Sequence, residues 1–405
     1  MILTKTRSVI YGNEGGVKPK EVGVSLAKRD TYIREQLNIE EEVLNFTGII
    51  IEDNQIFVSF PKKYVPSDID ISSDINLLFA TLIRHKQDNQ ELYIQKSINY
   101  KTNFPFNAFS EIYNYYIKYG VYKEENIKLQ TGYSGKVAWK NTIKHSAKVI
   151  SKNGLVFLPL QIKTIDRQDT LLSEFMLYAL DYTLDLFYTF WKRPLINGYI
   201  LQKKYIYNKA YVLENLYLIE KKLFKDIHKK LVKSLIDFFK NITVGGQYFF
   251  KHYSFNHIWE DMVEKYLNYN FIGENNKNLC FTESSIKRNS FRKATFYPNL
   301  VNKQQYIQPD HYLIDNKNQY IFDAKYYNEI NRVNYKQIVY YFCLKNYQAD
   351  TLKHTKTINA LILPGMSKQK IHFQFDPIFN NEEPEFYIIE CYLNIKSVMK
   401  KYIGS

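Results

Sequence analysis

Two acidic residues and a lysine stand on two short apolar segments near the end of the chain. Asp310 begins the segment 310–314, and Asp323 and Lys325 end the segment 319–325. The polar residues between the segments predict a β-hairpin. With a turn centred on residues 316 and 317, Asp310 lies opposite Asp323 with Cβ atoms about 5 Å apart. Lys325 points to the same face, because strand side chains alternate.

Two carboxylates and an amine on one sheet face suit the hydrolysis of a phosphodiester. The carboxylates would hold Mg²⁺, or Mn²⁺ in its place, which neutralises the phosphoryl oxygens and lowers the pKa of a bound water. Lys325 would orient that water or stabilise the charge that develops on the phosphate. The alternative is a surface hairpin with scattered acids. It is disfavoured because Asp323 ends an apolar run, where an unpaired charge is costly.

A predicted helix over residues 256–270 carries a third acidic candidate. Its apolar stripe places Glu260 on the flank, whereas Asp261 and Glu264 point to the opposite side. Considered alone, Glu260 is more simply a solvated surface acid. The hairpin downstream favours Glu260 as a third metal ligand.

A second predicted helix, over residues 331–345, carries Gln337 on its apolar face. An amide at such a position needs a partner. It either belongs to the site or is bonded by a neighbouring backbone group, and the sequence leaves both interpretations open.

These residues resemble a known motif. Pro309 and Asp310, followed after twelve residues by Asp323-Ala324-Lys325, resemble the PD-(D/E)XK nuclease motif. Residues 337–341 resemble the QxxxY motif of its RecB-like members. Residues 306–313 and 322–327 are similar to McrC-type nuclease subunits, and especially to the LlaJI restriction endonuclease family. The resemblance is clear over residues 245–405 and faint before them.

The resemblance implies a Mg²⁺-dependent, site-directed deoxyribonuclease of a restriction system used in phage defence. Its partners would be double-stranded DNA and an McrB-like AAA+ GTPase. Its catalytic residues would be Asp310, Asp323, Lys325, Glu260 and Gln337, with Asp310, Asp323 and Glu260 as metal ligands. Two other interpretations stay open. One is a repair or recombination nuclease that acts alone, and the other is a catalytically silent adaptor, against which the intact acids and lysine argue.

The predicted fold class is an α/β nuclease domain, restriction-endonuclease-like, with a mixed central sheet flanked by helices. It occupies residues 241–405, with strands at 309–325, 360–363 and 386–392. Before it, residues 1–105 form an α+β module for partner docking, and residues 106–240 form a mixed, then helical, region that contacts the partner or DNA. The module contains strands 47–52 and 55–60, a helix at 74–86 and a helical tendency over 31–43.

Composition narrows the class of protein. A chain of 405 residues with 45% hydrophobic content is long enough for several cores. The net charge of +14 favours a polyanionic partner, although AT-rich coding sequence would also enrich lysine. No signal peptide or membrane-spanning segment is expected, and three widely spaced cysteines indicate reduced, mostly buried thiols in a cytoplasmic protein.

No nucleotide site is expected in this chain. The glycine cluster at residues 12–18 lacks the Ser or Thr that follows a phosphate-loop lysine, since Pro19 follows Lys18, and no strand is expected before it. The basic stretch at residues 136–148 has two interpretations. It contacts phosphates, or it is a helix that buries Trp139 and Ile143 and leaves its lysines in solvent, which is the simpler interpretation.

Overall fold

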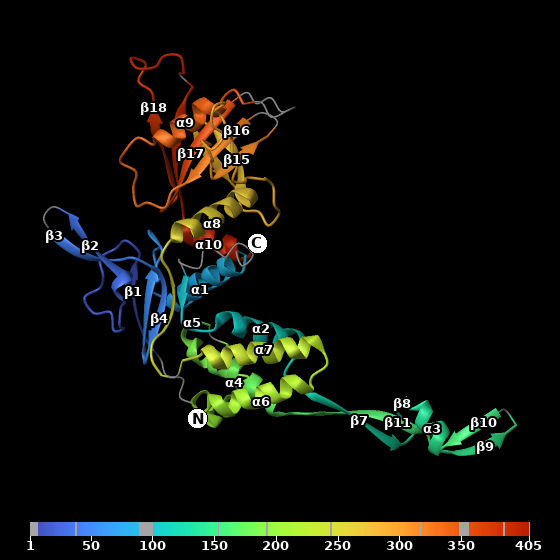
Figure 1. Cartoon of the computed structure of the whole chain (residues 1–405). Helices are drawn as coiled ribbons and strands as arrows, with labels where there is room; N and C mark the ends of the chain where they lie inside the picture. Colours follow the sequence, from blue (N-terminus) through green and yellow to red (C-terminus); the bar gives the residue numbers. More distant parts are fainter. Residues whose placement is uncertain are drawn as a thin grey trace. The chain divides into compact units, whose positions relative to one another are not determined.

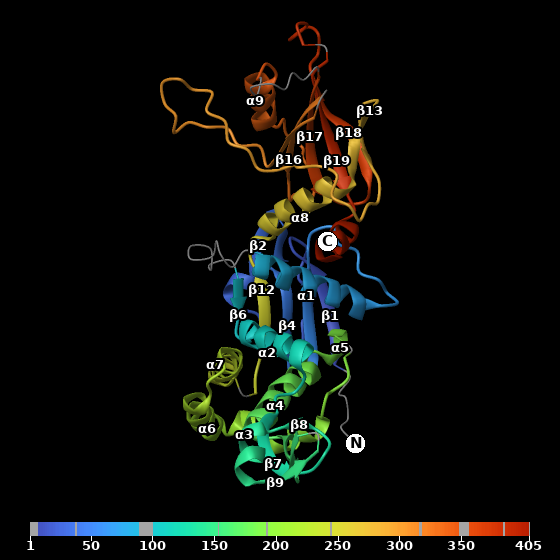
Figure 2. The ribbon, with the colours of Figure 1, turned by 90° about the vertical axis from the view of Figure 1, so that its right-hand side faces the viewer.

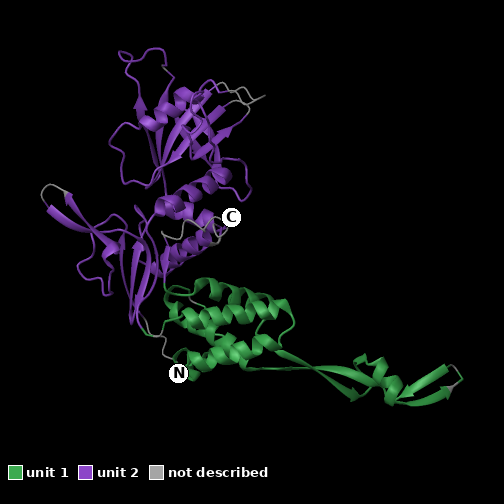
Figure 3. Ribbon diagram, in the orientation of Figure 1, with its two compact units in different colours: residues 1–4, 103–245 green, residues 5–102, 246–405 purple. Residues whose placement is uncertain are grey.

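The computed structural model describes residues 7–36, 39–88, 100–152, 154–191, 193–243, 245–315, 318–347, 356–383 and 385–404 (Figure 1). The chain forms two compact units (Figure 3). One unit contains residues 103–245, and the other contains residues 5–102 together with those from 246 onward.

A five-stranded sheet joins the two parts of the sequence that make up one unit. Its strand order is β1-β5-β4-β12-β6. These strands are β1 (Ser8–Asn13), β5 (Gln55–Phe60), β4 (Thr47–Glu52), β12 (Tyr248–His252) and β6 (Tyr100–Thr102). Because β12 pairs with both β4 and β6, a strand that follows residue 246 completes the sheet formed by the first 102 residues.

The predicted elements of this module are largely confirmed. Strands β4 and β5 form the expected hairpin, whose turn places Asp53 at a φ of 50°, a conformation that Asp and Asn tolerate. The expected helix is α1 (Ile71–Asp88), which contacts β4. One expectation about the glycine cluster is wrong, because strand β1 leads directly into it.

The helical tendency expected over residues 31–43 is also wrong. These residues form the hairpin β2 (Thr31–Gln36) and β3 (Ile39–Leu44), preceded by the short 3-10 helix η1 (Lys28–Asp30). An ion pair of 2.7 Å between Arg34 and Glu41 crosses the hairpin. Cross-strand contacts therefore override the helix preference of the glutamates, which is a weak prior.

The other unit contains a helical core and a β arm. The helices are α2 (Phe106–Tyr119), α4 (Leu171–Leu186), α5 (Tyr188–Trp191), α6 (Lys209–Lys222) and α7 (Asp226–Asn241), with 3-10 turns at η3 (Gly198–Lys203) and η4 (Tyr205–Tyr207). Gly120 ends α2 at a φ of 75°, as its position predicted. The apolar pattern over 213–239 is divided into two helices by residues 223–225.

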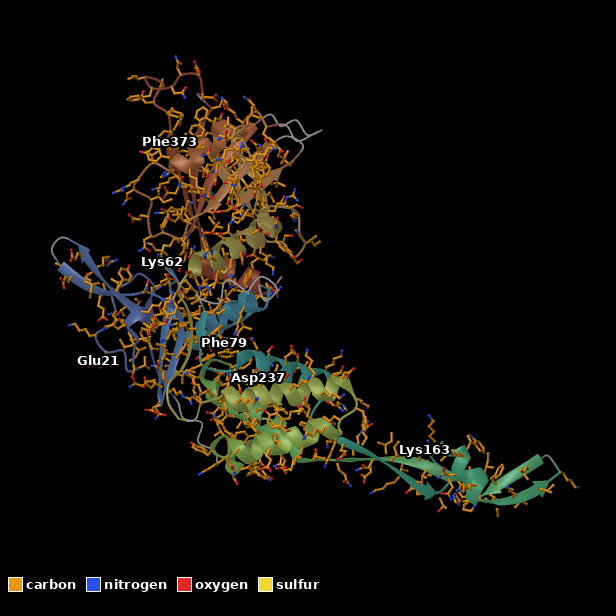
Figure 4. The ribbon with its side chains drawn as sticks, viewed as in Figure 1. Glu21, Lys62, Phe79, Lys163, Asp237 and Phe373 are labelled. Carbon is orange, nitrogen blue, oxygen red and sulfur yellow. The ribbon has the colours of Figure 1, made fainter. Side chains whose placement is uncertain are left out.

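The β arm comprises residues 124–168 and extends from the helices as a thin structure (Figures 1 and 4). Its elements are β7 (Glu124–Thr131), β8 (Lys136–Val137), α3 (Trp139–His145), β9 (Ala147–Ser151), β10 (Gly154–Leu158) and β11 (Gln161–Gln168). Trp139 and Ile143 are 58% and 49% exposed, so the expectation that they are buried is wrong. The arm is too thin to cover both faces of its own strands.

The C-terminal sheet is mixed, as predicted, with strand order β15-β16-β17-β19-β18. The strands are β15 (His311–Ile314), β16 (Asn318–Ala324), β17 (Lys356–Pro364), β19 (Tyr387–Leu393) and β18 (Lys368–Gln374). The pairs β16–β17 and β17–β19 are parallel, and the two outer pairs are antiparallel. All three strand predictions for this region are confirmed.

Helices α8 (Phe255–Asn270), α9 (Tyr335–Leu344) and α10 (Ile395–Gly404) accompany this sheet (Figure 2). A small hairpin of β13 (Phe271–Asn275) and β14 (Asn278–Phe281) follows α8. Trp259 of α8 is fully buried and donates its ring N–H to the carbonyl of Ile362 at 3.3 Å. Helix α9 begins four residues later than predicted, because the Asn334 side chain caps it.

Other sequence expectations are met in part. No helix in the described ranges is both long and apolar enough to cross a membrane. The three cysteines are free, but only Cys391 is buried, whereas Cys280 is partly and Cys343 fully exposed.

Tyr326, which directly follows Lys325, links the two sheets of its unit. Its buried hydroxyl donates to Glu14 at 2.9 Å and accepts from the backbone N–H of Lys62 at 2.7 Å. The Lys62 ammonium, labelled in Figure 4, lies 4.9 Å from the centre of the Tyr326 ring. Desolvation raises the pKa of Glu14, so this carboxyl depends on its hydrogen-bond donors. The first sheet therefore holds the backbone next to Lys325.

Replacing Tyr326 with Phe tests this link. We expect the free energy of unfolding to fall by about 1–2 kcal/mol, because Glu14 loses a donor and the Lys62 N–H loses its acceptor. Urea denaturation measures the change. Tyr327→Phe is the matched control, since Tyr327 is 54% exposed. Equal unfolding curves for both variants would contradict the link.

Candidate active site

The β15–β16 register brings the two predicted acids together. His311 pairs with Phe322 and Ile314 pairs with Gln319, which is the register expected from the sequence. Asp310 precedes β15 by one residue, and its Oδ2 accepts the backbone N–H of Ala324 at 3.2 Å. The turn residues 316 and 317 lie outside the described residues. The predicted juxtaposition of Asp310 and Asp323 is present.

Asp323 is the most buried charge of this group, with no exposed surface. Lys325 and Lys336 flank its carboxylate: the Lys325 ammonium contacts Oδ2, and the Lys336 ammonium lies 3.6 Å from Oδ1. Neither Asp323 oxygen accepts a hydrogen bond of normal geometry from the described residues. Both oxygens therefore face ammonium groups and the space between the strands' side chains.

The two carboxyl groups titrate as a pair, because both are buried. Burial, together with the adjacent Asp323 and the charge of Glu260, raises the pKa of Asp310 to about 8. Burial also acts to raise the pKa of Asp323, but its interaction with Asp310 and the charges of Lys325 and Lys336 lower it. At neutral pH the pair thus holds one proton, mainly on Asp310.

Lys325 is placed by the sheet. Its backbone N–H donates to the carbonyl of Ile362 in β17 at 2.8 Å, which extends the pairing of β16 and β17 beyond Ala324. Its side chain is largely buried, with 15% exposed, and lies against Asp323 as strand alternation predicted.

Glu260 lies at the edge of the site and does not join the two aspartates directly. Its carboxylate is 3.5 Å from the ammonium of Lys293, which in turn is 3.8 Å from Asp310. Asp261 turns away from this group and lies 3.1 Å from the ring of His85. The preference for Glu260 over Asp261 agrees with these positions.

Gln337 is fully buried against β16. Its amide donates to the carbonyl of Ile321 at 2.6 Å and lies 3.4 Å from the side chain of Asn359. This is the backbone-bonded arrangement that the sequence left open. Gln337 therefore fixes α9 on the sheet, and its contacts in the described residues do not include the carboxylates. Its catalytic assignment stays a prediction.

Three residues near the acids were missed by sequence reasoning. Lys336 precedes Gln337 in the first turn of α9. Burial acts to lower its pKa, but the charge of Asp323 outweighs this and raises the pKa of Lys336 above its usual range. Lys293 comes from the segment before β15. His311 is buried, burial lowers its pKa to about 4, and its ring nitrogens have no partner in the described residues. Only Lys336, beside a singled-out glutamine, carried a usable signal.

Asp310 and Asp323 fit a Mg²⁺ site completed by water and substrate oxygens, since Mg²⁺ is commonly held by one or two carboxylates. The unbonded oxygens of Asp323 are suitable ligands. In the described ranges, no three acidic, histidine or cysteine side chains stand close enough to hold an ion together. Glu260 would have to displace Lys293 to reach the ion, so its assignment as a ligand stays a prediction.

Comparisons with known proteins give matches to solved structures at low sequence identity. No protein-family model matches the sequence, and no curated protein matches it. A chain in the refined half-complex from the tetradecameric assembly of Thermococcus gammatolerans McrB AAA+ hexamers with bound McrC is 13% identical at a TM-score of 0.41, with 98% of both chains covered.

A chain in the cryo-EM structure of the Thermococcus gammatolerans McrBC complex is 12% identical at a TM-score of 0.23. The match covers 62% of this chain and 85% of that one. Both TM-scores are below 0.5, so the function is inferred from the residues of the site.

Asp310→Asn tests the shared proton. Ionising Asp310 beside Asp323 costs free energy in the folded state. The unfolded chain therefore loses the Asp310 proton at a lower pH than the folded protein does. Folded-state stability thus falls as pH rises from about 4 towards 8. Asn imitates the protonated form. In metal-free buffer we expect it to stabilise the protein by about 1–3 kcal/mol at pH values near 8 and by little near pH 4.

Thermal unfolding at several pH values measures this difference. Asp376→Asn, at an exposed acid of the same unit, is the control. A stabilisation by Asp310→Asn that does not change with pH would show that the two carboxyl groups do not share a proton.

Proposed function

We propose that this protein is a Mg²⁺-dependent DNA endonuclease subunit. The observation that carries the proposal is the pair of buried carboxylates Asp310 and Asp323, on one sheet face, with the ammonium groups of Lys325 and Lys336 beside them. Such a pair is costly without a cation, and the flanking lysines suit a substrate that is itself an anion.

Each residue has a part in the proposed hydrolysis. Asp310 and Asp323 would hold the ion, which supplies charge neutralisation and an acidified water when bound. Lys325 would orient the attacking water beside the phosphate. Lys336 would approach a non-bridging phosphoryl oxygen, whose negative charge grows as the bond to the leaving oxygen breaks. Lys293 would be available to the DNA backbone once the aspartates hold the ion.

The proposed partner is an McrB-like AAA+ GTPase of a restriction system. The motif resemblance supports this, as does the β arm, which exposes large apolar side chains outside any core. These include Ile127, Tyr133, Trp139, Ile150, Leu155 and Ile165, each at least 53% exposed. Exposed apolar residues in such number mark interaction surfaces. The net charge of +14 supports double-stranded DNA as the other partner.

Replacing Asp323 with Ala tests the nuclease proposal. We expect DNA cleavage to be lost, while the variant folds and still binds the partner, because the ion loses its central ligand. Binding of Mn²⁺, followed by its paramagnetic resonance signal, should be lost as well. Glu382→Gln, at an exposed acid, is the control. Wild-type cleavage by the Asp323 variant would rule out this site.

Replacing Lys336 with Met, and Gln337 with Met in a second variant, distinguishes the roles of these two neighbouring residues. We expect cleavage to slow by about 10²-fold, the cost of one transition-state donor, with some loss of stability because buried Asp323 loses a flanking ammonium group. Gln337→Met should lower the unfolding midpoint without removing a charge from the site, since it leaves the buried carbonyl of Ile321 unbonded. Lys400→Met, on the exposed side of α10, is the control. Unchanged cleavage by the Lys336 variant would remove it from the site.

Mixing the chain with DNA, Mg²⁺, GTP and a candidate McrB-like GTPase separates the proposed role from its alternatives. Cleavage that requires the GTPase supports the restriction subunit. Robust cleavage by the chain alone indicates a stand-alone nuclease, and no cleavage under either condition indicates a silent adaptor.

A further inference from the structure

Most of the segment between β14 and β15 carries basic residues as its only charges. From Ser284 to Pro309 it contains no acidic residue and five basic ones, Lys287, Arg288, Arg292, Lys293 and Lys303. It ends directly at Asp310, and Lys293 already lies beside Asp310 and Glu260. A polyanion that reaches the two aspartates would therefore pass along this segment.

Both ends of this segment are attached to the nuclease-like sheet and its helix. Phe296 forms an antiparallel bridge with Ile307, and its ring lies 4.8 Å from that of Tyr312 and 5.1 Å from that of Tyr347. The hydroxyl of Tyr340 in α9 donates to the carbonyl of Gln308 at 2.7 Å. The loop of residues 297–306, which we call the tip loop, is thus anchored to the sheet and to α9 at both of its ends.

The tip loop is organised by its own polar side chains. The Asn299 side chain accepts the backbone N–H groups of Val301 and Asn302 at 2.9 and 3.3 Å. The Asn302 side chain accepts that of Gln304 at 2.9 Å. These bonds present Leu300 and Val301 to solvent with 96% and 95% of their surface exposed. Compact loops of this kind are frequently functional. Figure 2 shows the orange segment before β15 projecting from the sheet.

We propose that the tip loop contacts duplex DNA and inserts Leu300 and Val301 as a wedge against a base step near the scissile phosphate. The inference rests on the proposed nuclease function. The basic segment matches the phosphate backbone, whereas two adjacent branched apolar residues match the apolar faces of the bases. Apolar side chains of this type unstack base steps in DNA-bending proteins. Tyr297 and Tyr306, both more than half exposed, flank the wedge.

A comparison of two DNA probes tests the wedge. The full-length protein is titrated, in buffer with EDTA to prevent cleavage, into a fluorescent duplex of mixed sequence and into the same duplex with a central run of mismatches. Mismatched steps are already unstacked, so a wedge binds them more tightly. We expect the wild type to prefer the mismatched duplex by at least ~10-fold. We expect a Leu300→Ser, Val301→Ser double variant to bind both probes equally.

The control is the double variant Ile378→Ser, Phe379→Ser, which removes two adjacent apolar residues of similar exposure, 87% and 84%, elsewhere in the same unit. It should keep the wild-type preference. Equal binding of the two probes by wild-type protein would overturn the wedge and leave the nuclease proposal standing. Wild-type protein that binds neither probe would overturn the DNA contact of the tip loop, whereas the cleavage assay with Mg²⁺ and the GTPase decides the nuclease proposal. Loss of GTPase binding in the tip-loop variant, with its DNA preference intact, would assign the loop to the protein partner and overturn the DNA contact.

Discussion

Two carboxyl groups held side by side in a buried position set the main constraint on the C-terminal half of this protein. Asp310 is 8% exposed and Asp323 is not exposed. Bulk water therefore screens their repulsion poorly. The pair retains a proton, and two ammonium groups from different elements lie beside it. Lys325 follows β16, and Lys336 belongs to α9. A cation and an anionic substrate would complete this arrangement of charges.

The surrounding structure keeps these charges from moving apart. The parallel pairing of β16 with β17 continues to the backbone of Lys325. The Gln337 side chain bonds α9 to the carbonyl of Ile321, two residues before Asp323. Tyr326, the residue after Lys325, is hydrogen-bonded to Glu14 and Lys62 of the first sheet. The N-terminal module is thus part of the support for the candidate site, in addition to any docking role. A change in that module can therefore reach Lys325 through the hydrogen bonds of its chain neighbour Tyr326.

The sequence predictions succeeded where neighbouring residues decide the structure. The hairpins β4–β5 and β15–β16, the strands β17 and β19, and helix α8 follow from alternation, turn residues and apolar periodicity, which act over a few residues. They failed where cross-strand pairing outweighed a weak helix preference and where a second layer of structure was missing. Residues 31–43 became a hairpin through cross-strand contacts, and Trp139 is exposed because the β arm has no second layer to cover it.

The sequence alone determined that Asp310, Asp323 and Lys325 share one face, because the hairpin register and strand alternation are local properties. Only the tertiary structure decided which groups surround them. It brought Lys336 and Lys293 to the acids, placed Lys293 between Glu260 and Asp310, and bonded Gln337 to the carbonyl of Ile321. Those contacts depend on how α8, α9 and the segment before β15 pack on the sheet. Such packing is the sum of many long-range contacts, and the spacing of residues along one chain does not encode it locally.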